Sequence, residues 1–237
     1  MIELNKIYNQ DCLEGMKLID DNSIDLIVTD PPYLVTSRGN SGNSGGMFRK
    51  QINKNGKVFE HNSIDIIEWL NPLYRVLKES GHCYIMTNNK NLMHYLDIIG
   101  KSDFHFIKSL IWDKGNKIMG QFYMSQFEYI LFLRKGFGKK INNCGTPDII
   151  KAQNIKTKEN GGGNMHDTEK PEKLMNILIE NSSKQSDTVL DPFMGSGTTA
   201  ISCIKNSRKF LGFEIDKKLF EVSDFRIKKE LNQIKLF

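Results

Sequence analysis

A single stretch decides the fold of this chain: Ile24-Asp25-Leu26-Ile27-Val28-Thr29-Asp30-Pro31-Pro32-Tyr33. Its apolar and β-branched residues predict a buried strand, and the two prolines end it because each lacks a backbone donor and has a fixed φ. The carbonyls beside the prolines then have no strand to pair with and can point at a ligand. Asp30 falls at the carboxyl end of the strand, where open α/β sheets bind ligands. This stretch alone leaves a plain strand and proline-rich turn open as the alternative.

The composition indicates a globular protein large enough for one α/β domain with a small insertion. The chain has 237 residues, of which 39% are hydrophobic and 26% charged. No apolar run approaches the ~20 residues that a membrane span needs, and the start lacks the basic and then apolar pattern of a signal peptide, so we expect a cytoplasmic protein. The net charge of +5 permits a nucleic-acid partner without demonstrating one.

The cysteines predict free thiols and no metal centre. Cys12, Cys83, Cys144 and Cys203 are far apart, with no Cys-x-x-Cys pair and no nearby pair of histidines. We therefore expect neither disulfides nor a zinc site.

Strands and helices alternate along most of the chain. This order predicts an α/β fold with a doubly wound, mainly parallel sheet and helices on both faces. Strands are expected at 7–8, 24–29, 82–87, 104–112, 127–133, 187–191 and 209–216. Helices are expected to start at residue 12, at Asn62 or Ser63, at Asn91, at Pro171 and after Gly197. The second helix should run to about Glu79, with a kink at Pro72 and an end at Gly81.

Two segments break this pattern. Residues 34–60 include a run at 36–46 with almost no apolar side chains, which predicts a flexible loop or a mobile lid beside Asp30. Residues 136–165 hold five lysines against two acids and end near three glycines. We expect an inserted basic segment outside the sheet, with a solvated loop as the alternative. Its lysines are Lys139, Lys140, Lys151, Lys156 and Lys158.

A second strand, turn and helix follow near the carboxyl terminus, at Asp191-Pro192-Phe193-Met194-Gly195-Ser196-Gly197-Thr198-Thr199. Gly195 and Gly197 let the backbone approach a ligand, and the helix offers unpaired amides. The Gly-x-x-x-x-Gly-Lys pattern of a phosphate loop is absent, and Ala200 replaces the third glycine of a dinucleotide fingerprint. An adenosine cofactor without a pyrophosphate fits better. Glu214 ends the next strand where nucleotide folds place a ribose-binding acid.

Together these motifs resemble the β class of amino-group DNA methyltransferases, which use S-adenosylmethionine. The resemblance rests on Thr29–Tyr33 as catalytic motif and Asp191–Thr199 as cofactor motif, in that order, and covers nearly the whole chain except 34–60 and 136–165. The segment His166-Asp167-Thr168-Glu169-Lys170-Pro171 resembles the family's His-Pro-Thr-Gln-Lys-Pro and departs from it at Asp167 and Glu169. The family order implies a circularly permuted, Rossmann-like fold in which the strands ending at Asp30 and Asp191 are neighbours.

The resemblance also implies roles for single residues. Asp30 and the carbonyl of Pro31 or Pro32 would accept hydrogen bonds from the exocyclic amine of a flipped base, on which Tyr33 would stack. Such acceptors favour a pyramidal amine nitrogen, so the reaction needs mainly positioning and electrostatic support.

On the cofactor side, the resemblance distributes S-adenosylmethionine over several segments. Asp191 would face the methionine amine, Lys170 and Thr168 the methionine carboxylate, and Glu214 the ribose. Asp11 and the Cys12 amide would meet the adenine edge, for which an ordinary helix start is the alternative. The remaining pocket residues would be Phe193, Gly195, Ser196, Gly197 and Thr198.

The function that we expect is site-specific methylation of adenine N6 in double-stranded DNA. Asp before Pro-Pro-Tyr favours adenine, because Ser is commoner there in cytosine-N4 enzymes, which are the alternative. An RNA or protein methyltransferase and a non-catalytic adenosine-binding module are weaker alternatives. Residues 1–135 would form the catalytic half, 136–165 a target-recognition insertion whose five lysines contact DNA, and 166–237 the cofactor-binding half. Related enzymes are often dimers, so a homodimer is also open.

Overall fold

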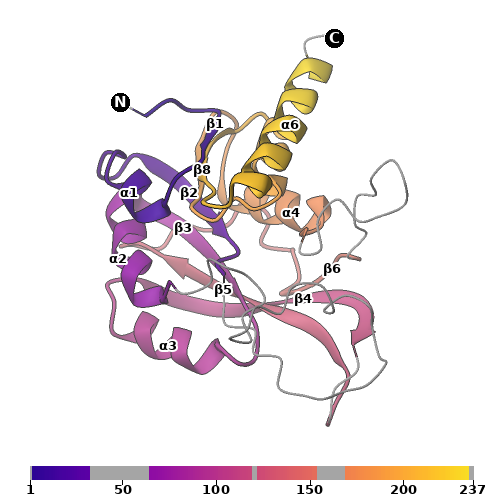
Figure 1. The fold of residues 1–237 in the computed structure, drawn as a ribbon. Coiled ribbons are helices and arrows are strands. Elements are labelled where there is room, and N and C mark those ends of the chain that lie inside the picture. The colour runs from indigo at the N-terminus through magenta and orange to yellow at the C-terminus, as the bar shows by residue number, and fades with distance from the viewer. Residues whose placement is uncertain (1, 33–63, 119–121, 154–168, 235–237) are drawn as a thin grey trace, which may run out of the picture.

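A computed structural model describes residues 2–32, 64–118, 122–153 and 169–234 (Figure 1). Its strands are β1 (Lys6–Tyr8), β2 (Ile24–Thr29), β3 (Leu77–Thr87), β4 (His105–Ile118), β5 (Ser125–Arg134), β6 (Ile149–Lys151), β7 (Thr188–Asp191) and β8 (Lys209–Phe213). Its helices are α1 (Cys12–Met16), α2 (Ile66–Val76), α3 (Leu92–Gly100), α4 (Glu172–Ser182), α5 (Thr198–Lys205) and α6 (Lys217–Ile234).

The strands form one sheet in the order β1-β8-β7-β2-β3-β5-β4-β6. Five strand pairs between described residues are parallel, and the two pairs made by β5, with β3 and with β4, are antiparallel. The prediction of a mainly parallel sheet is confirmed. β2 lies beside β7, with Leu26 opposite Val189 and Ile27 opposite Leu190, although the two strands are far apart in sequence.

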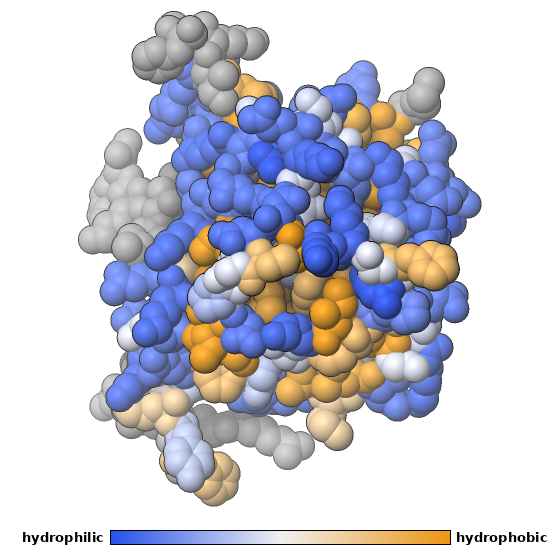
Figure 2. Space-filling view, turned by 180° about the vertical axis from the view of Figure 1, so that it is seen from behind, coloured by the Kyte–Doolittle hydropathy of each residue, from blue (hydrophilic) through white to orange (hydrophobic). Residues whose placement is uncertain are grey.

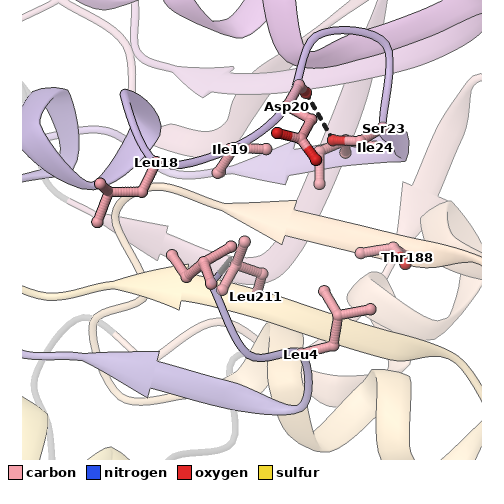
Figure 3. Close-up of a pocket in the computed structure, with 9 residues that line it drawn as sticks. Leu4, Leu18, Ile19, Asp20, Ser23, Ile24, Thr188 and Leu211 are labelled. Carbon is pink, nitrogen blue, oxygen red and sulfur yellow. Dashed lines mark hydrogen bonds between the residues drawn. The ribbon is translucent and has the colours of Figure 1, made fainter.

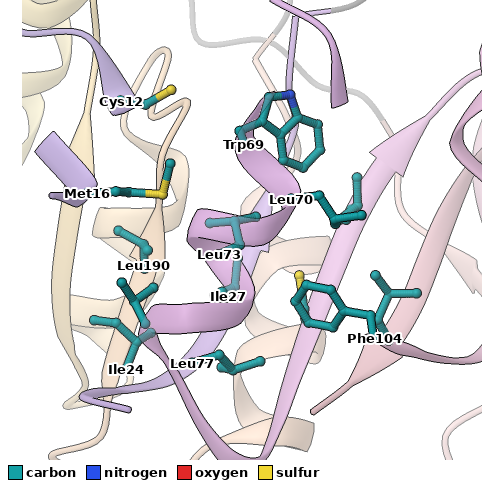
Figure 4. Close-up of a cluster of buried hydrophobic side chains, with 14 of the residues drawn as sticks. Cys12, Met16, Ile24, Ile27, Trp69, Leu70, Leu73, Leu77, Phe104 and Leu190 are labelled. Atoms are coloured by element: carbon teal, nitrogen blue, oxygen red, sulfur yellow. The ribbon is translucent and has the colours of Figure 1, made fainter. Parts of the chain in front are cut away.

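Two hydrophobic clusters cover the two faces of the sheet, because neighbouring residues of a strand point to opposite sides. Helices α1, α2 and α3 pack on one face, where Trp69 and Leu73 of α2 join Ile27 of β2 (Figure 4). Helices α4, α5 and α6 pack on the other face, together with Leu26 of β2. This arrangement confirms a doubly wound sheet with helices on both faces.

The boundary between α2 and β3 differs from the prediction. The helix ends at Val76 instead of about Glu79, because Leu77 is extended and pairs with Ile24. Gly81 therefore lies inside β3 and does not end a helix. A Cβ at Gly81 would lie 2.7 Å from Leu77 Cδ1, so close packing accounts for this glycine.

The start of α2 also differs. Asn62 and Ser63 lie outside the described residues, and the helix begins at Ile66 with Asp65 as its N-cap. Asp65 and Glu68 form a reciprocal capping box, in which each side chain accepts a hydrogen bond from the other's backbone amide. The helix runs through Pro72.

The basic segment 136–165 does not lie entirely outside the sheet, which corrects the prediction. Ile149, Ile150 and Lys151 form β6, which pairs in parallel with Ile111–Asp113 of β4 at the edge of the sheet. Ile150 and Ala152 are buried, and Trp112 donates a 2.8 Å hydrogen bond to the carbonyl of Ala152. Apolar burial therefore holds this part of the segment against β4.

Expectations about membranes and metals can be compared with the described residues only. There, no helix combines the length and apolar character that crossing a bilayer requires. The same residues contain no group of three or more His, Cys, Asp or Glu side chains that could hold a metal ion. All four cysteines are described, and all four are free thiols.

Candidate active site

The two predicted poles of the site meet at the carboxyl edge of the sheet, the edge at which β2, β3, β7 and β8 end. Asp30 directly follows β2, and Asp191 is the last residue of the neighbouring β7. Thr29 Oγ1 donates a 3.0 Å hydrogen bond to Asp191 Oδ1. The predicted adjacency of the two strand ends is confirmed.

Asp191 is a buried carboxylate held by three donors. Besides Thr29, Thr199 Oγ1 donates to Oδ2 at 2.6 Å, and the amide of Phe193 donates to Oδ1 at 3.1 Å. Burial raises the pKa of Asp191 to about 6, although these hydrogen bonds favour the charged form. The result is a rigid carboxylate beside the glycine turn, with a chemistry that suits a ligand ammonium. Its assignment to the methionine amine stays a prediction.

Asp30 has one engaged and one unengaged oxygen. Its Oδ2 forms an ion pair with Lys170 Nζ. Within the part of the chain that the structure describes, Asp30 Oδ1 is buried and lacks a hydrogen-bond partner. Burial is the main cause that raises the pKa of Asp30; Lys170 opposes the rise and Glu128 adds to it. A buried acceptor without a donor costs free energy, and a ligand N–H group can satisfy it.

Two charged neighbours of this ion pair were not predicted from the sequence. Glu128 Oε1 of β5 accepts a 3.0 Å hydrogen bond from Lys114 Nζ of β4, and Glu128 Oε2 lies 4.0 Å from Lys170 Nζ. Both ammonium groups lie 5.8 Å from the ring of the buried Trp112. Lys170 therefore lies between two carboxylates, those of Asp30 and Glu128. The available signal was an acid inside the otherwise apolar run from Phe127 to Leu133.

The glycine turn is held by Glu214. One oxygen of Glu214 accepts from the amide of Gly195 at 2.8 Å, and the other accepts from the amide of Asp216, also at 2.8 Å. Gly197 has φ of +83°, and a Cβ there would lie 3.0 Å from Ser223 Cβ. Glu214 thus already shapes the turn in the protein alone, while its contact with a ribose stays a prediction.

A second buried ion pair supports the same turn and was not predicted. Glu169 is 5% exposed and pairs with Arg226 of α6 at 2.5 Å. Arg226 also donates a 2.7 Å hydrogen bond to the carbonyl of Ser196. The departure from the family pattern at Glu169 therefore has a structural partner, which links the segment before α4 to the turn.

The segment at Asp11 lies next to Glu214. Asn9 Nδ2 donates to the Glu214 carbonyl at 2.8 Å. Asp11 Oδ1 accepts from the amides of Leu13 at 2.8 Å and Glu14 at 3.3 Å, which confirms the helix start. Burial, helped by the charge of Asp11, raises the pKa of Cys12 to about 12, so it stays a thiol. The contact of Asp11 and Cys12 with adenine stays a prediction.

Other predicted residues are divided between edges of the sheet or lie outside the described residues. Lys139 and Lys140 are exposed. They lie near the amino edge of the sheet, where the carbonyl oxygen of Lys139 is 3.0 Å from Nε2 of His82, the first residue of β3 that pairs with β5. Lys151 lies at the opposite, carboxyl edge, opposite Asp113. The structure does not bring these lysines together. Four predicted residues lie outside the described part: Tyr33, Lys156, Lys158 and Thr168.

A small cavity at the amino edge is separate from this site. It has a volume of about 170 Å³ and is lined by residues that include Ile19, Ile24, Thr188 and Leu211 (Figure 3). Ile24 and Thr188 begin β2 and β7, whereas Asp30 and Asp191 lie at the other ends of those strands. Asp20 is the one ionisable residue in the lining of this cavity, whereas several charged side chains surround Asp30.

Comparison with known proteins identifies the family. A family model described as a DNA methylase matches residues 24–225. This chain belongs to that DNA methylase family. The matched range contains both Asp30 and the Asp191–Thr199 turn, so the expectation of an amino-group DNA methyltransferase is confirmed.

Individual relatives agree with the family. Type II methyltransferase M.HinfI of Haemophilus influenzae is 30% identical over an alignment of 247 positions, which covers 95% of this chain and 68% of that protein. Type II methyltransferase M2.MboI of Moraxella bovis is 27% identical, with 93% of this chain and 86% of that protein covered.

Solved structures confirm the Rossmann-like fold of this DNA methylase. The crystal structure of an M1.HpyAVI–SAM complex has a TM-score of 0.67 at 23% identity and covers 93% of this chain and 98% of its own. PvuII DNA methyltransferase, described as cytosine-N4-specific, has a TM-score of 0.70 at 18% identity, and the match covers 97% of this chain and 92% of the PvuII chain. At these identities the likeness establishes the fold.

Proposed function

We propose that this DNA methylase transfers a methyl group from S-adenosylmethionine to the N6 amine of an adenine that is flipped out of duplex DNA. The observation that carries the proposal is the buried Oδ1 of Asp30, which has no hydrogen-bond partner among the described residues and lies next to the strand that ends at Asp191. An exocyclic amine supplies the N–H donor that this oxygen lacks. Family membership supports DNA as the substrate.

The groups around the glycine turn fit S-adenosylmethionine. The Asp191 carboxylate suits its amine, and the Lys170 ammonium suits its carboxylate. The glycine turn before α5 lets the backbone approach its adenosine part. When bound, S-adenosylmethionine supplies a methyl group already activated by its positive sulfur. A solved structural neighbour of this chain is a complex with SAM, which supports the same cofactor here.

Asp30 then acts on the amine to be methylated. Its Oδ1 accepts one amine N–H, which localises the nitrogen lone pair towards the methyl donor. Lys170 holds Oδ2 and thereby fixes the direction of Oδ1. Methylation leaves an extra proton on the nitrogen, and the raised pKa of Asp30 makes its Oδ1 a suitable acceptor for that proton.

Adenine is favoured because Asp precedes Pro31-Pro32, as in the adenine-specific members that the sequence resembles. Cytosine N4 is the second candidate, since its amine presents the same donors and a fold neighbour of this chain is described as cytosine-N4-specific. We also propose a cytoplasmic location and retain a homodimer as a prediction that light scattering can check.

The deciding experiment is methylation of duplex DNA with a labelled cofactor, followed by identification of the modified nucleoside. N6-methyladenine is the expected product. N4-methylcytosine alone would overturn the choice of base, and labelling of only RNA or protein would overturn DNA as substrate.

Variants test the role of Asp30 in the same assay. We expect Asp30→Ala to lose nearly all methyl transfer while it still binds the cofactor. Asp97→Ala is the matched control. Asp97 is exposed on α3, and among the described residues its one ion pair is with Lys101, four positions along the chain. An Asp30→Ala variant with full transfer activity would exclude the proposed mechanism and favour a binding module.

A further inference from the structure

A two-stranded arm projects from the edge of the sheet that carries the active site. We call residues 114–118 and 122–126 the β4–β5 arm. β3 ends at Thr87 opposite Tyr129, and β6 ends at Lys151 opposite Asp113. Beyond these points the described parts of β4 and β5 pair only with each other, and Ile118 still pairs with Ser125 (Figure 1).

The base of the arm is tied to the catalytic groups. Lys114 pairs with Glu128, which approaches Lys170, and Lys170 pairs with Asp30. Asp113 Oδ1 also accepts hydrogen bonds from the amide of Gly115 at 2.9 Å and from Gln126 at 3.0 Å, one from each strand. The base of the arm is therefore braced, and it is linked to Asp30 through Glu128 and Lys170.

The described outer residues of the arm are two aromatic residues and a methionine, and all three are exposed. Phe122 is 88% exposed, Tyr123 91% and Met124 55%. In the view from behind, the arm stands away from the body at the lower left and ends in apolar and pale side chains (Figure 2). Between residues 114 and 126 the sequence has two lysines, Lys114 and Lys117, and no acid. Consecutive exposed aromatic residues on an acid-free arm indicate a binding element.

We propose that the β4–β5 arm enters a groove of the duplex and that Phe122 and Tyr123 contact bases next to the extruded target base. The proposal rests on DNA being the substrate, as the proposed function states. Aromatic side chains stack on bases of any sequence, and architectural DNA-binding proteins insert apolar side chains between base steps. The absence of acids on the arm suits the negative phosphates.

The dimensions of the arm fit this role. Extended chain covers about 3.3 Å per residue, so the paired part of β5 from Phe127, opposite Asp113, to Ser125, opposite Ile118, reaches roughly 7 Å past the last sheet neighbour of β4. β4 bulges over the same distance, because its register with β5 shifts between Asp113 and Ile118. The major groove of B-DNA is about 12 Å wide and admits a two-stranded β-ribbon. An arm whose base is linked to Asp30 through Glu128 and Lys170 can thus follow the groove while Asp30 faces the flipped base.

The test compares three variants with the wild type: Phe122→Ala/Tyr123→Ala, Phe122→Trp/Tyr123→Trp, and Phe137→Ala. Phe137 is the matched control, because it is also 88% exposed but lies beyond the end of β5, on the amino side. Each protein is assayed for kcat/KM and for duplex binding by fluorescence anisotropy. The substrates are an intact duplex and one in which the target base faces an abasic site.

We expect the double alanine variant to lose about tenfold or more in kcat/KM on the intact duplex, as loss of base stacking predicts. The loss should be smaller on the abasic duplex, where extrusion is easier. The double tryptophan variant and Phe137→Ala should keep the wild-type values. Unchanged kinetics and binding in the double alanine variant, or an equal loss in Phe137→Ala, would overturn the proposal.

Two further outcomes distinguish DNA binding by the arm from self-association and from a failure of the proposed function. If the wild type self-associates and only the double alanine variant does not, with DNA binding unchanged, the arm binds a second copy and the proposal is wrong. If the wild type transfers no methyl group to DNA, the proposed function fails, and the anisotropy titration still tests the arm by its effect on duplex affinity.

Discussion

Replacement of Asp191 by Asn should stabilise the protein alone at neutral pH. Burial raises the pKa of Asp191 from 3.8 to about 6, so ionisation of this carboxyl opposes folding. A group whose pKa is raised on folding contributes stability below its unfolded pKa, and that stability is lost as the pH rises through the folded value. Asn has nearly the same shape and carries no charge at any of these pH values.

The magnitude follows from the difference in pKa of about two units. Each unit corresponds to about 1.36 kcal/mol, which gives an advantage of about 3 kcal/mol for Asp191→Asn at pH 8. The hydrogen bonds survive, because the amide oxygen can accept from Thr29 and Phe193, and the amide nitrogen can donate to the Thr199 hydroxyl. The advantage should shrink towards zero below pH 4, where both proteins are neutral at this position.

Urea unfolding of the two proteins without cofactor, from pH 4.5 to 8, measures this difference. His82 also titrates, since burial lowers its pKa from 6.5 to about 4 and makes folding less favourable as the pH falls through that range. His82 is present in both proteins, so the difference between them cancels its effect. A variant that is less stable than the wild type at pH 8, or a difference that does not change with pH, would refute the reasoning. We also expect weaker cofactor binding by the variant, measured by calorimetry.

Three further changes test the surroundings of the site. Glu128→Gln removes a charge that raises the pKa of Asp30, so the acidic limb of the kcat profile should move to lower pH; an unmoved profile would contradict the coupling. Gly197→Ala places a side chain at φ of +83° and should cost about 1–2 kcal/mol in urea unfolding, whereas a neutral effect would show that the turn can adapt. Glu169→Ala leaves the 10%-exposed Arg226 side chain without its carboxylate and should cost about 3–5 kcal/mol, with a much smaller cost if Arg226 reaches solvent.

Much of the fold could be predicted because strand and helix periodicities are local. The strand at 24–29 has the predicted bounds, and from Leu26 to Val28 its apolar residues alternate between the two faces as the twofold strand period requires. The neighbourhood of Asp30 and Asp191 is not local. Their proximity could be predicted only because the order of the motifs resembles that of a family with a permuted sheet.

The errors arise where tertiary contacts override local pattern. Residues 77–79 continue the helical spacing of α2, but Leu77 pairs with Ile24 and begins a strand instead. Residues 149–151 lie in a segment rich in lysine, yet Ile150 is 3% exposed against β4. A lysine count describes the solvent side of such a segment and says nothing about the edge strand that the segment can join.

The position of Lys170 shows why the chemistry of the site also needs the structure. The family pattern places Lys170 on the cofactor, but in the protein alone its ammonium pairs with Asp30 and approaches Glu128 at 4.0 Å. If Lys170 binds the cofactor carboxylate as the resemblance implies, that carboxylate and Asp30 would compete for the three donors of one ammonium group. Any contact that draws Lys170 towards the cofactor weakens its hold on Asp30 and raises the pKa of that carboxyl. Cofactor binding would thus prepare Asp30 to receive the proton that methylation releases.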